Sequence, residues 1–240
     1  MKTVVITGAT RGLGLATALQ AVTEGYRVIA VGRNLSNELD QAIKQKPELL
    51  SFEQFDLSNV EKIHEFATYI SKKYGRLWGL VNNAALGTDG VLATLHEKDI
   101  GQLIRVNVEA PILLSKYLLR PMLMNRAGRI INISSIIATT GFSGLSVYGA
   151  TKAAMSGFTR SLSREVGKAG ITVNTIAPGY METDMTSGLQ GEKLESIKRR
   201  SPLGHLAKAE DVAHAVTYLL SDKASNITGS TITVDAGSTA

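Results

Sequence analysis

The 240-residue sequence predicts an α/β fold in which a parallel sheet of seven strands is covered by helices on both faces. Three observations predict it. Short β-branched apolar runs alternate with segments of helical period along the whole chain. A glycine-rich turn separates the first strand from the first helix. The composition, 44% hydrophobic and 20% charged, is that of an ordinary globular protein.

Seven short apolar runs are the expected strands. Their β-branched content is typical of strands buried on both faces of a parallel sheet, with right-handed crossovers between them. The runs are Thr3–Thr7, Arg27–Val31, Leu49–Phe55, Leu77–Val81, Arg129–Ser134, Ile171–Ile176 and Thr231–Val234.

Segments of helical period fill the intervals between these strands. No linker rich in proline and serine divides the chain, which favours one domain over 1–240. The segment 179–208 is rich in Gly, Thr, Met and charge, and we expect it to form a substrate flap. The expected helices are Leu13–Glu24, which ends at Gly25, and 36–46, 59–73, 97–125, 148–168 and 209–221.

The composition excludes several classes of protein. The chain has no cysteine, which excludes disulfide scaffolds, thiolate zinc sites and cysteine nucleophiles. Its four histidines lie far apart in sequence, so we expect no metal site. No apolar stretch approaches the ~18 residues of a membrane span, and the first apolar run is too short for a signal peptide. We therefore expect a cytoplasmic protein.

The formal net charge of +5 is spread along the chain. Its densest basic group, Lys198–Arg200, lies near Glu192 and Glu195 and predicts a solvated helix face, so we expect no nucleic-acid partner. Aromatic residues, at 5%, are too few for a base-stacking surface. The basic balance suits a small anionic substrate or an acidic carrier protein.

The turn after the first strand has the sequence TGATRGLG and covers Thr7–Gly14. Gly8 permits a tight turn, Gly12 lets the backbone approach a pyrophosphate, and Gly14 lets the helix pack close to the sheet. The helix amino terminus offers free N–H groups to the phosphates. The turn predicts a dinucleotide site in a doubly wound sheet of the Rossmann type; a glycine-rich turn without a ligand is the alternative.

The spacing Gly-x-x-x-Gly-x-Gly resembles that of the short-chain dehydrogenase/reductase family. This resemblance spans nearly the whole chain and implies an oxidoreductase that uses a nicotinamide dinucleotide. Ala85 departs from it, because the family has a glycine there. The further motifs, in the family's order, are NNAA at Asn82–Ala85, Asn107 in RVNVEAP, Ser135 in INISSI, YGATK at Tyr148–Lys152 and PGYMETDM at Pro178–Met185.

Two arginines indicate which nicotinamide cofactor to expect. In the family, an acidic residue at the end of the second strand marks NAD, because it accepts hydrogen bonds from the ribose 2′-hydroxyl. Gly32 stands at this position, Arg33 follows it, and Arg11 lies in the glycine turn. Two guanidinium groups suit a 2′-phosphate, so we expect NADP(H). Arg33 as a solvated surface residue is the alternative.

The resemblance implies the other cofactor contacts. Asp56 and Leu57 would contact adenine, although Asp56 could equally serve only as a turn residue before a helix. Asn83 and Ala84 would line the adenosine ribose and the nicotinamide. The expected cofactor-binding residues are Gly8, Thr10, Arg11, Gly12, Leu13, Gly14, Arg33, Asp56, Leu57, Asn83, Ala84, Tyr148, Lys152, Pro178, Gly179, Met181 and Thr183.

Tyr148 and Lys152 are four residues apart and share one face of an expected helix. We expect the ammonium, the positive nicotinamide of oxidised cofactor and local hydrogen bonds jointly to lower the phenol's pKa from its usual value of about 10, so that Tyr148 can act as a general acid toward a carbonyl oxygen. By resemblance, Ser135 bonds the same oxygen, with Ser134 as the competitor, and Lys152 also binds the nicotinamide ribose. Asn107 would hold a water that relays protons to Lys152; the alternative is an asparagine that satisfies backbone groups.

The sequence VNTIAPGYMETDM most resembles the bacterial branch of the family that reduces 3-oxoacyl thioesters of acyl carrier protein with NADPH. That branch contacts the acidic carrier through basic residues at positions matching Arg126, which fits, and Ala169, which does not, although Lys168 adjoins it. The thioester could also be linked to CoA. A small free ketone, aldehyde, sugar or secondary alcohol is the alternative substrate, and a non-catalytic NADP-binding regulator is a remote alternative. Apolar flap residues that suit an acyl chain are Met181, Met185, Leu189 and Leu194.

Small residues follow Tyr148 on its helix. They permit close packing either onto the sheet or onto another subunit. The family is commonly tetrameric through this helix and the one over 97–125, so we expect a homotetramer. The small residues are Ala150, Ala153, Ala154 and Gly157.

Overall fold

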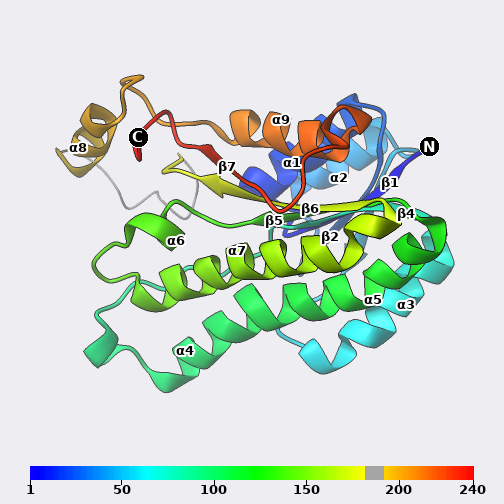
Figure 1. Ribbon diagram of the computed structural model, residues 1–240, viewed down its shortest axis with the longest axis horizontal. Helices are drawn as coiled ribbons and strands as arrows, with labels where there is room; N and C mark the ends of the chain where they lie inside the picture. Colours follow the sequence, from blue (N-terminus) through cyan, green and yellow to red (C-terminus); the bar gives the residue numbers. More distant parts are fainter. Residues whose placement is uncertain (182–191) are drawn as a thin grey trace.

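A computed structural model describes residues 1–181 and 192–240. Within them, a seven-stranded parallel sheet has the order β3-β2-β1-β4-β5-β6-β7 (Figure 1). The expected fold class is confirmed. The order reverses between β1 and β4, the switch point at which such sheets bind ligands. The strands are β1 (Thr3–Thr7), β2 (Arg27–Gly32), β3 (Leu50–Gln54), β4 (Leu77–Asn82), β5 (Gly128–Ile133), β6 (Ile171–Pro178) and β7 (Thr231–Val234).

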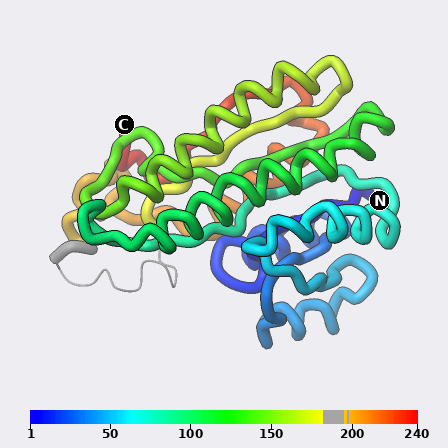
Figure 2. Tube along the Cα trace, turned by 90° about the horizontal axis from the view of Figure 1, so that it is seen from below, coloured from blue at the N-terminus to red at the C-terminus, as the bar shows by residue number. Residues whose placement is uncertain are grey.

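Helices cover both faces of the sheet. One face carries α1 (Gly12–Thr23), α2 (Asn37–Gln45) and α9 (Ala209–Leu220) over a buried apolar cluster. The other carries α3 (Ile63–Tyr74), α5 (Ala110–Asn125) and α7 (Ser146–Val166) over a second one. Figure 2 shows these last three helices side by side beneath the sheet. The inner strands are buried on both faces, which is why they are apolar runs rather than alternating ones. The edge strands β3 and β7 are partly exposed, so the expected burial on both faces is wrong for them.

The segment 97–125, expected as one helix, contains an irregularity. It consists of α4 (Glu97–Ile104), a π-helical turn, η3 (Arg105–Glu109), and α5. Such wide turns inside helices occur frequently at functional sites. Asn107 lies in this turn and is buried.

The short elements η2 (Leu92–Thr94), α6 (Ile137–Thr140) and η5 (Asp222–Ala224) were not expected, because a single turn carries no measurable period. The expected helix 59–73 begins with η1 (Val60–Lys62) before α3, and η4 (Gly167–Ala169) overlaps the end of the expected helix 148–168. In the expected flap, α8 (Glu192–Arg200) is a helix. Thr183, Met185 and Leu189 lie outside the described residues, as does the side chain of Leu194.

The small residues of α7 point away from the sheet. Ala150, Ala153 and Ala154 are exposed, and a Cβ on Gly157 would meet no atom within 4 Å. The sheet-facing positions are larger and include Thr151, Lys152, Met155 and Thr159. These small residues therefore do not pack onto the sheet, which was one of the two partners expected for them. They face outward, where another subunit could contact them.

None of the helices in residues 1–181 and 192–240 has both the length and the apolar character that a membrane crossing requires.

Candidate active site

A cleft of about 880 Å³ opens where the glycine turn meets the segments that follow β2, β4, β5 and β6, with α7 forming another part of its wall. Side chains far apart in sequence meet here because parallel strands end at one edge of the sheet. The predicted residues that line it are Gly8, Thr10, Arg11, Gly12, Leu13, Gly14, Arg33, Asp56, Leu57, Asn83, Ala84, Ser135, Tyr148, Lys152, Pro178, Gly179 and Met181.

The glycine turn is built without side chains at its tightest points. Gly8 has φ +65° and faces Ala84 at the end of β4, where a Cβ would lie 2.9 Å from the Ala84 Cα. A Cβ on Gly14 would lie 2.1 Å from the Gly8 carbonyl oxygen. The helix therefore contacts the turn at backbone distance, which leaves the helix amino terminus open to a phosphate. This cradle fits a dinucleotide.

Asn83 holds that turn in place. Its Nδ2 donates to the carbonyl oxygens of Thr7 at 2.8 Å and of Gly8 at 3.3 Å. In return, Thr7 Oγ1 accepts from the backbone N–H groups of Asn83 at 3.0 Å and Ala84 at 3.1 Å. The Asn83 side chain thus ties β1 to β4. The part played by Thr7 was not expected from the sequence, where the residue only ends a strand.

The end of β2 offers guanidinium groups and no carboxylate. Arg33 is exposed at the cleft, and its carbonyl oxygen accepts from Gln54 Nε2 at 2.8 Å. Arg11 lines the same cleft. A Cβ at Gly32 would lie 2.5 Å from Thr10 Cγ2. An acidic side chain at Gly32 has no room unless Thr10 moves.

Asp56 makes the local turn that was its alternative role. Its Oδ1 accepts from the backbone N–H of Ser58 at 2.9 Å, and the residue also lines the cleft. Both roles are compatible, since a carboxylate has further acceptor sites.

The two neighbouring serines are clearly distinguished. Ser134 is buried, and its Oγ donates to the Lys152 carbonyl oxygen at 2.8 Å. Ser135 lines the cleft together with Tyr148 and acts to lower the pKa of that phenol, while its Oγ accepts from Ile137 N–H at 3.2 Å. Ser135 is therefore the serine beside the phenol, as the thirteen-residue offset predicted, and Ser134 anchors α7 to β5.

In the protein by itself, the pKa of Tyr148 is raised rather than lowered. Burial raises the pKa of Tyr148 to about 12, with Asp89 adding to the rise and Ser135 opposing it. Lys152 lies under the ring, with Nζ 5.6 Å from the ring centroid, and donates to the Ile133 carbonyl oxygen at 2.9 Å. Burial lowers the pKa of Lys152 to about 8. Desolvation of both groups therefore outweighs the attraction between ammonium and phenolate.

Asn107 does not line the cleft. Its Nδ2 donates to the Leu86 carbonyl oxygen at 2.9 Å and to Thr151 Oγ1 at 3.2 Å, and its Oδ1 accepts from Leu86 N–H at 2.8 Å. The side chain satisfies the backbone of the segment after β4, which is the alternative that the sequence left open. That segment forms part of the cleft wall, so Asn107 acts on the site through Leu86.

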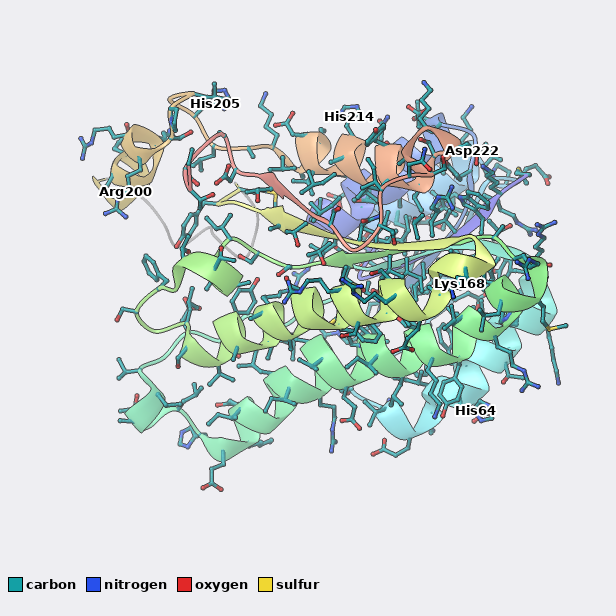
Figure 3. All side chains as sticks on the ribbon, viewed as in Figure 1. His64, Lys168, Arg200, His205, His214 and Asp222 are labelled. Atoms are coloured by element: carbon teal, nitrogen blue, oxygen red, sulfur yellow. The ribbon has the colours of Figure 1, made fainter. Side chains whose placement is uncertain are left out.

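The residues expected to contact a carrier lie at the other edge of the sheet. Arg126 caps the end of α5 just before β5 begins, and its Nη2 donates to the Lys168 carbonyl oxygen at 3.2 Å. Ala169 is partly buried against an apolar cluster. Figure 3 shows Lys168 and Arg200 at opposite ends of the molecule. Within one chain, Arg126 is remote from the cleft.

The cleft lining also includes residues that the sequence reasoning did not assign to the site, among them Asp89, Phe142 and Tyr180. Phe142 and Tyr180 make an edge contact, with ring centroids 6.2 Å apart. The charge of Asp89 raises the pKa of both Tyr148 and Tyr180. The only sequence signal was the position of Tyr180 inside PGYMETDM.

A doubly wound sheet with a glycine cradle at its switch point and a Ser–Tyr–Lys wall beside it defines the molecule as an α/β oxidoreductase that binds a dinucleotide. A family model described as enoyl-(acyl carrier protein) reductase matches residues 8–239. The chain belongs to the short-chain dehydrogenase/reductase family.

Curated relatives match almost end to end. The chain is similar to 3-oxoacyl-(acyl-carrier-protein) reductase FabG of Salmonella typhimurium and of Escherichia coli K12, each 37% identical over 238 residues. It is also similar to the protein of that name from Rickettsia conorii, 40% identical over 236 residues. These matches cover 98% of this chain and 96% of each relative.

Proposed function

We propose that this chain is an NADPH-dependent carbonyl reductase whose substrate is a 3-oxoacyl thioester, linked to acyl carrier protein or to CoA. The observation that carries the proposal is that Ser135, Tyr148 and Lys152 line the same cleft as the glycine cradle. The printed names of the relatives, all 3-oxoacyl-(acyl-carrier-protein) reductases, support the substrate class.

The preference for NADPH is supported by the end of β2. Arg33 and Arg11 line the cleft, and Thr10 occupies the space that a side chain at position 32 would need. A guanidinium–phosphate contact is worth about 1.5–3 kcal/mol, or roughly 10- to 150-fold in affinity. The arginines therefore favour a 2′-phosphate over a 2′-hydroxyl.

The reduction requires a proton at the carbonyl oxygen. Bound NADPH supplies the hydride to the carbonyl carbon. Tyr148 donates its phenolic proton to the oxygen, and Ser135 donates a hydrogen bond to the same oxygen. With a pKa of about 12, Tyr148 holds its proton through neutral pH and is a donor when the substrate arrives. Lys152 binds the nicotinamide ribose, and Asn107 supports a water that returns protons to Lys152.

The remaining proposals concern the chain as a whole. Residues 1–240 act as one domain with 179–208 as a flap over the substrate, and the protein works as a cytoplasmic homotetramer. The exposed small residues of α7, which permit close approach of a second helix, support the tetramer. Gel filtration at micromolar concentration is expected to give four times 25.6 kDa, and a single 25.6 kDa species would contradict it.

NADPH oxidation tests the substrate class, with acetoacetyl-CoA, an acetoacetyl thioester of acyl carrier protein and simple ketones in parallel. We expect the thioesters to be reduced fastest. Preference for a simple ketone would favour the alternative substrate, and NADPH binding without turnover of any carbonyl would favour the non-catalytic regulator.

Arg33→Asp tests the cofactor. We expect its preference for NADPH over NADH to fall about 10- to 150-fold, with Arg27→Asp at the opposite end of β2 as a charge-matched control. Unchanged preference would show that Arg33 is not the selector.

A further inference from the structure

Tyr180 is unusual among the described residues because its hydroxyl is buried without a partner. Within residues 1–181 and 192–240, three buried side-chain atoms lack a hydrogen bond: Asn82 Oδ1, Arg129 Nε and the Tyr180 hydroxyl oxygen. Of these residues, Tyr180 lines the cleft. A buried donor without an acceptor is costly and rare in folded proteins, so an acceptor from a ligand would recover that cost.

The surroundings of Tyr180 place it on the catalytic side of the cleft. Its ring contacts the edge of Phe142, in the segment between α6 and α7. The two charges that act on its phenol come from Asp89, after β4, and from Arg200, at the end of α8. Asp89 acts on the Tyr148 phenol as well. No member of this group belongs to the glycine turn or to β2, where the two arginines lie.

The charges around the phenol indicate the kind of acceptor. Arg200 and Asp89 act on the pKa of Tyr180 in opposite directions, Arg200 more strongly, so the two charges partly offset each other at the hydroxyl. A neutral carbonyl oxygen fits this environment. The phenol keeps its proton at neutral pH because burial raises its pKa, and it is therefore a donor.

We propose that the Tyr180 hydroxyl donates a hydrogen bond to a second carbonyl oxygen of the substrate, two carbons from the ketone that Tyr148 and Ser135 bind. Tyr180 would then be the residue that selects 1,3-dicarbonyl compounds, such as 3-oxoacyl thioesters and esters, over compounds with a single ketone. This inference rests on the proposed function and specifies which atoms of the substrate the cleft recognises.

Tyr180→Phe tests it, because the substitution removes only the hydroxyl. We expect kcat/KM for acetoacetyl-CoA and for ethyl acetoacetate to fall about five- to tenfold, the effect of one neutral hydrogen bond. The value for 2-heptanone and the dissociation constant of NADP⁺ are expected to stay within about twofold. Tyr218→Phe, which removes an exposed phenol on α9, is the matched control and is expected to change none of these values.

Binding gives a readout that does not depend on turnover. In the presence of NADPH, which cannot accept a hydride from this alcohol, calorimetric titration with 3-hydroxybutyryl-CoA is expected to show about five- to tenfold weaker binding to Tyr180→Phe, because the thioester carbonyl is retained in that product. Urea unfolding of the ligand-free variant is expected to show no loss of stability, since the deleted hydroxyl has no partner there.

The outcomes separate this inference from the proposed function. A wild-type protein that reduces no 1,3-dicarbonyl compound defeats the proposed function itself. If the wild type reduces these compounds, three results would each overturn the role of Tyr180: unchanged kcat/KM and product binding in Tyr180→Phe, an equal loss with 2-heptanone, or weaker NADP⁺ binding. The last result would assign the hydroxyl to the cofactor.

Discussion

The two halves of the cleft are built on opposite principles. In the half formed by the glycine turn and β2, close contacts are made at glycines. Gly14 packs against the Gly8 carbonyl, and Thr10 occupies the space that a Cβ at Gly32 would need. In the half formed by the end of β5 and α7, the important groups are polar side chains removed from water, such as Lys152 and Tyr148. The first half is sensitive to added atoms, and the second to lost hydrogen bonds and to pH.

The difference follows from what each half must accommodate. A pyrophosphate needs backbone N–H groups at close range, which any Cβ would obstruct. A proton transfer needs a donor whose pKa is controlled by its surroundings, which requires burial and neighbouring charges. Substitutions in the two halves should therefore fail in different measurements.

The largest effect is expected in the catalytic half. Tyr148→Phe removes the proton donor, so kcat should fall about 10²- to 10⁴-fold. The dissociation constant of NADPH should change little, because the cradle around Gly14 is formed by other elements. Steady-state kinetics and a fluorescence titration measure the two values. Full activity in this variant would show that Tyr148 is not the general acid. The catalytic half of the cleft would then not depend on a buried proton donor.

Lys152 provides the pH test. Its pKa is lowered from 10.5 to about 8 in the folded protein, so the folded state binds fewer protons than the unfolded state between these two values. The contribution of neutral Lys152 to the free energy of unfolding is therefore fully present above pH 10.5, and it is lost as the pH falls through about 8. Relative to Lys152→Met, the unfolding free energy of the wild type should rise by about 3 kcal/mol across this window. Urea unfolding at several pH values measures it, and parallel curves for the two proteins would contradict it.

The cofactor half should respond to added volume. Gly14→Ala places a methyl group against the Gly8 carbonyl, and the forced backbone shift should cost about 1–3 kcal/mol of stability and weaken NADPH binding at least about tenfold. Gly101→Ala, in α4 with no atom within 4 Å of the new Cβ, is the control. It should raise stability by about 0.5–1 kcal/mol. Thermal unfolding with and without NADPH compares them, and equal effects would show that the turn tolerates a side chain.

The smallest effects should separate the two serines. Ser135→Ala removes a hydrogen bond to the substrate oxygen and should lower kcat about tenfold with little change in stability. Ser134→Ala removes the bond to the Lys152 carbonyl and should lower the unfolding free energy by about 1 kcal/mol with a smaller effect on kcat. Activity and urea unfolding are measured on both. The reverse pattern would exchange the two roles.

The residues of the cleft were largely predictable, and their energetics were not. The motifs around Gly8, Asn83, Tyr148 and Pro178 are contiguous, and each follows a predicted strand or lies on a predicted helix. Tyr180 lies within such a motif, but the sequence does not show that its hydroxyl is buried without a partner. The surroundings of that phenol come from other segments, which contribute Asp89, Phe142 and Arg200. Asp89 belongs to a segment without periodicity and gave no signal.

The sequence by itself determined the alternation of strands and helices, the position of the glycine turn and the shared helix face of Tyr148 and Lys152. All three follow from rules that act over a few neighbouring residues: side-chain period, backbone freedom at glycine and the i, i+4 spacing. Only the tertiary structure decided that Ser134 anchors α7 to β5, whether Gly32 has room for an acid, and in which direction the pKa of Tyr148 moves. Those properties depend on burial and on contacts between distant segments, because desolvation arises only when the chain has packed around the group.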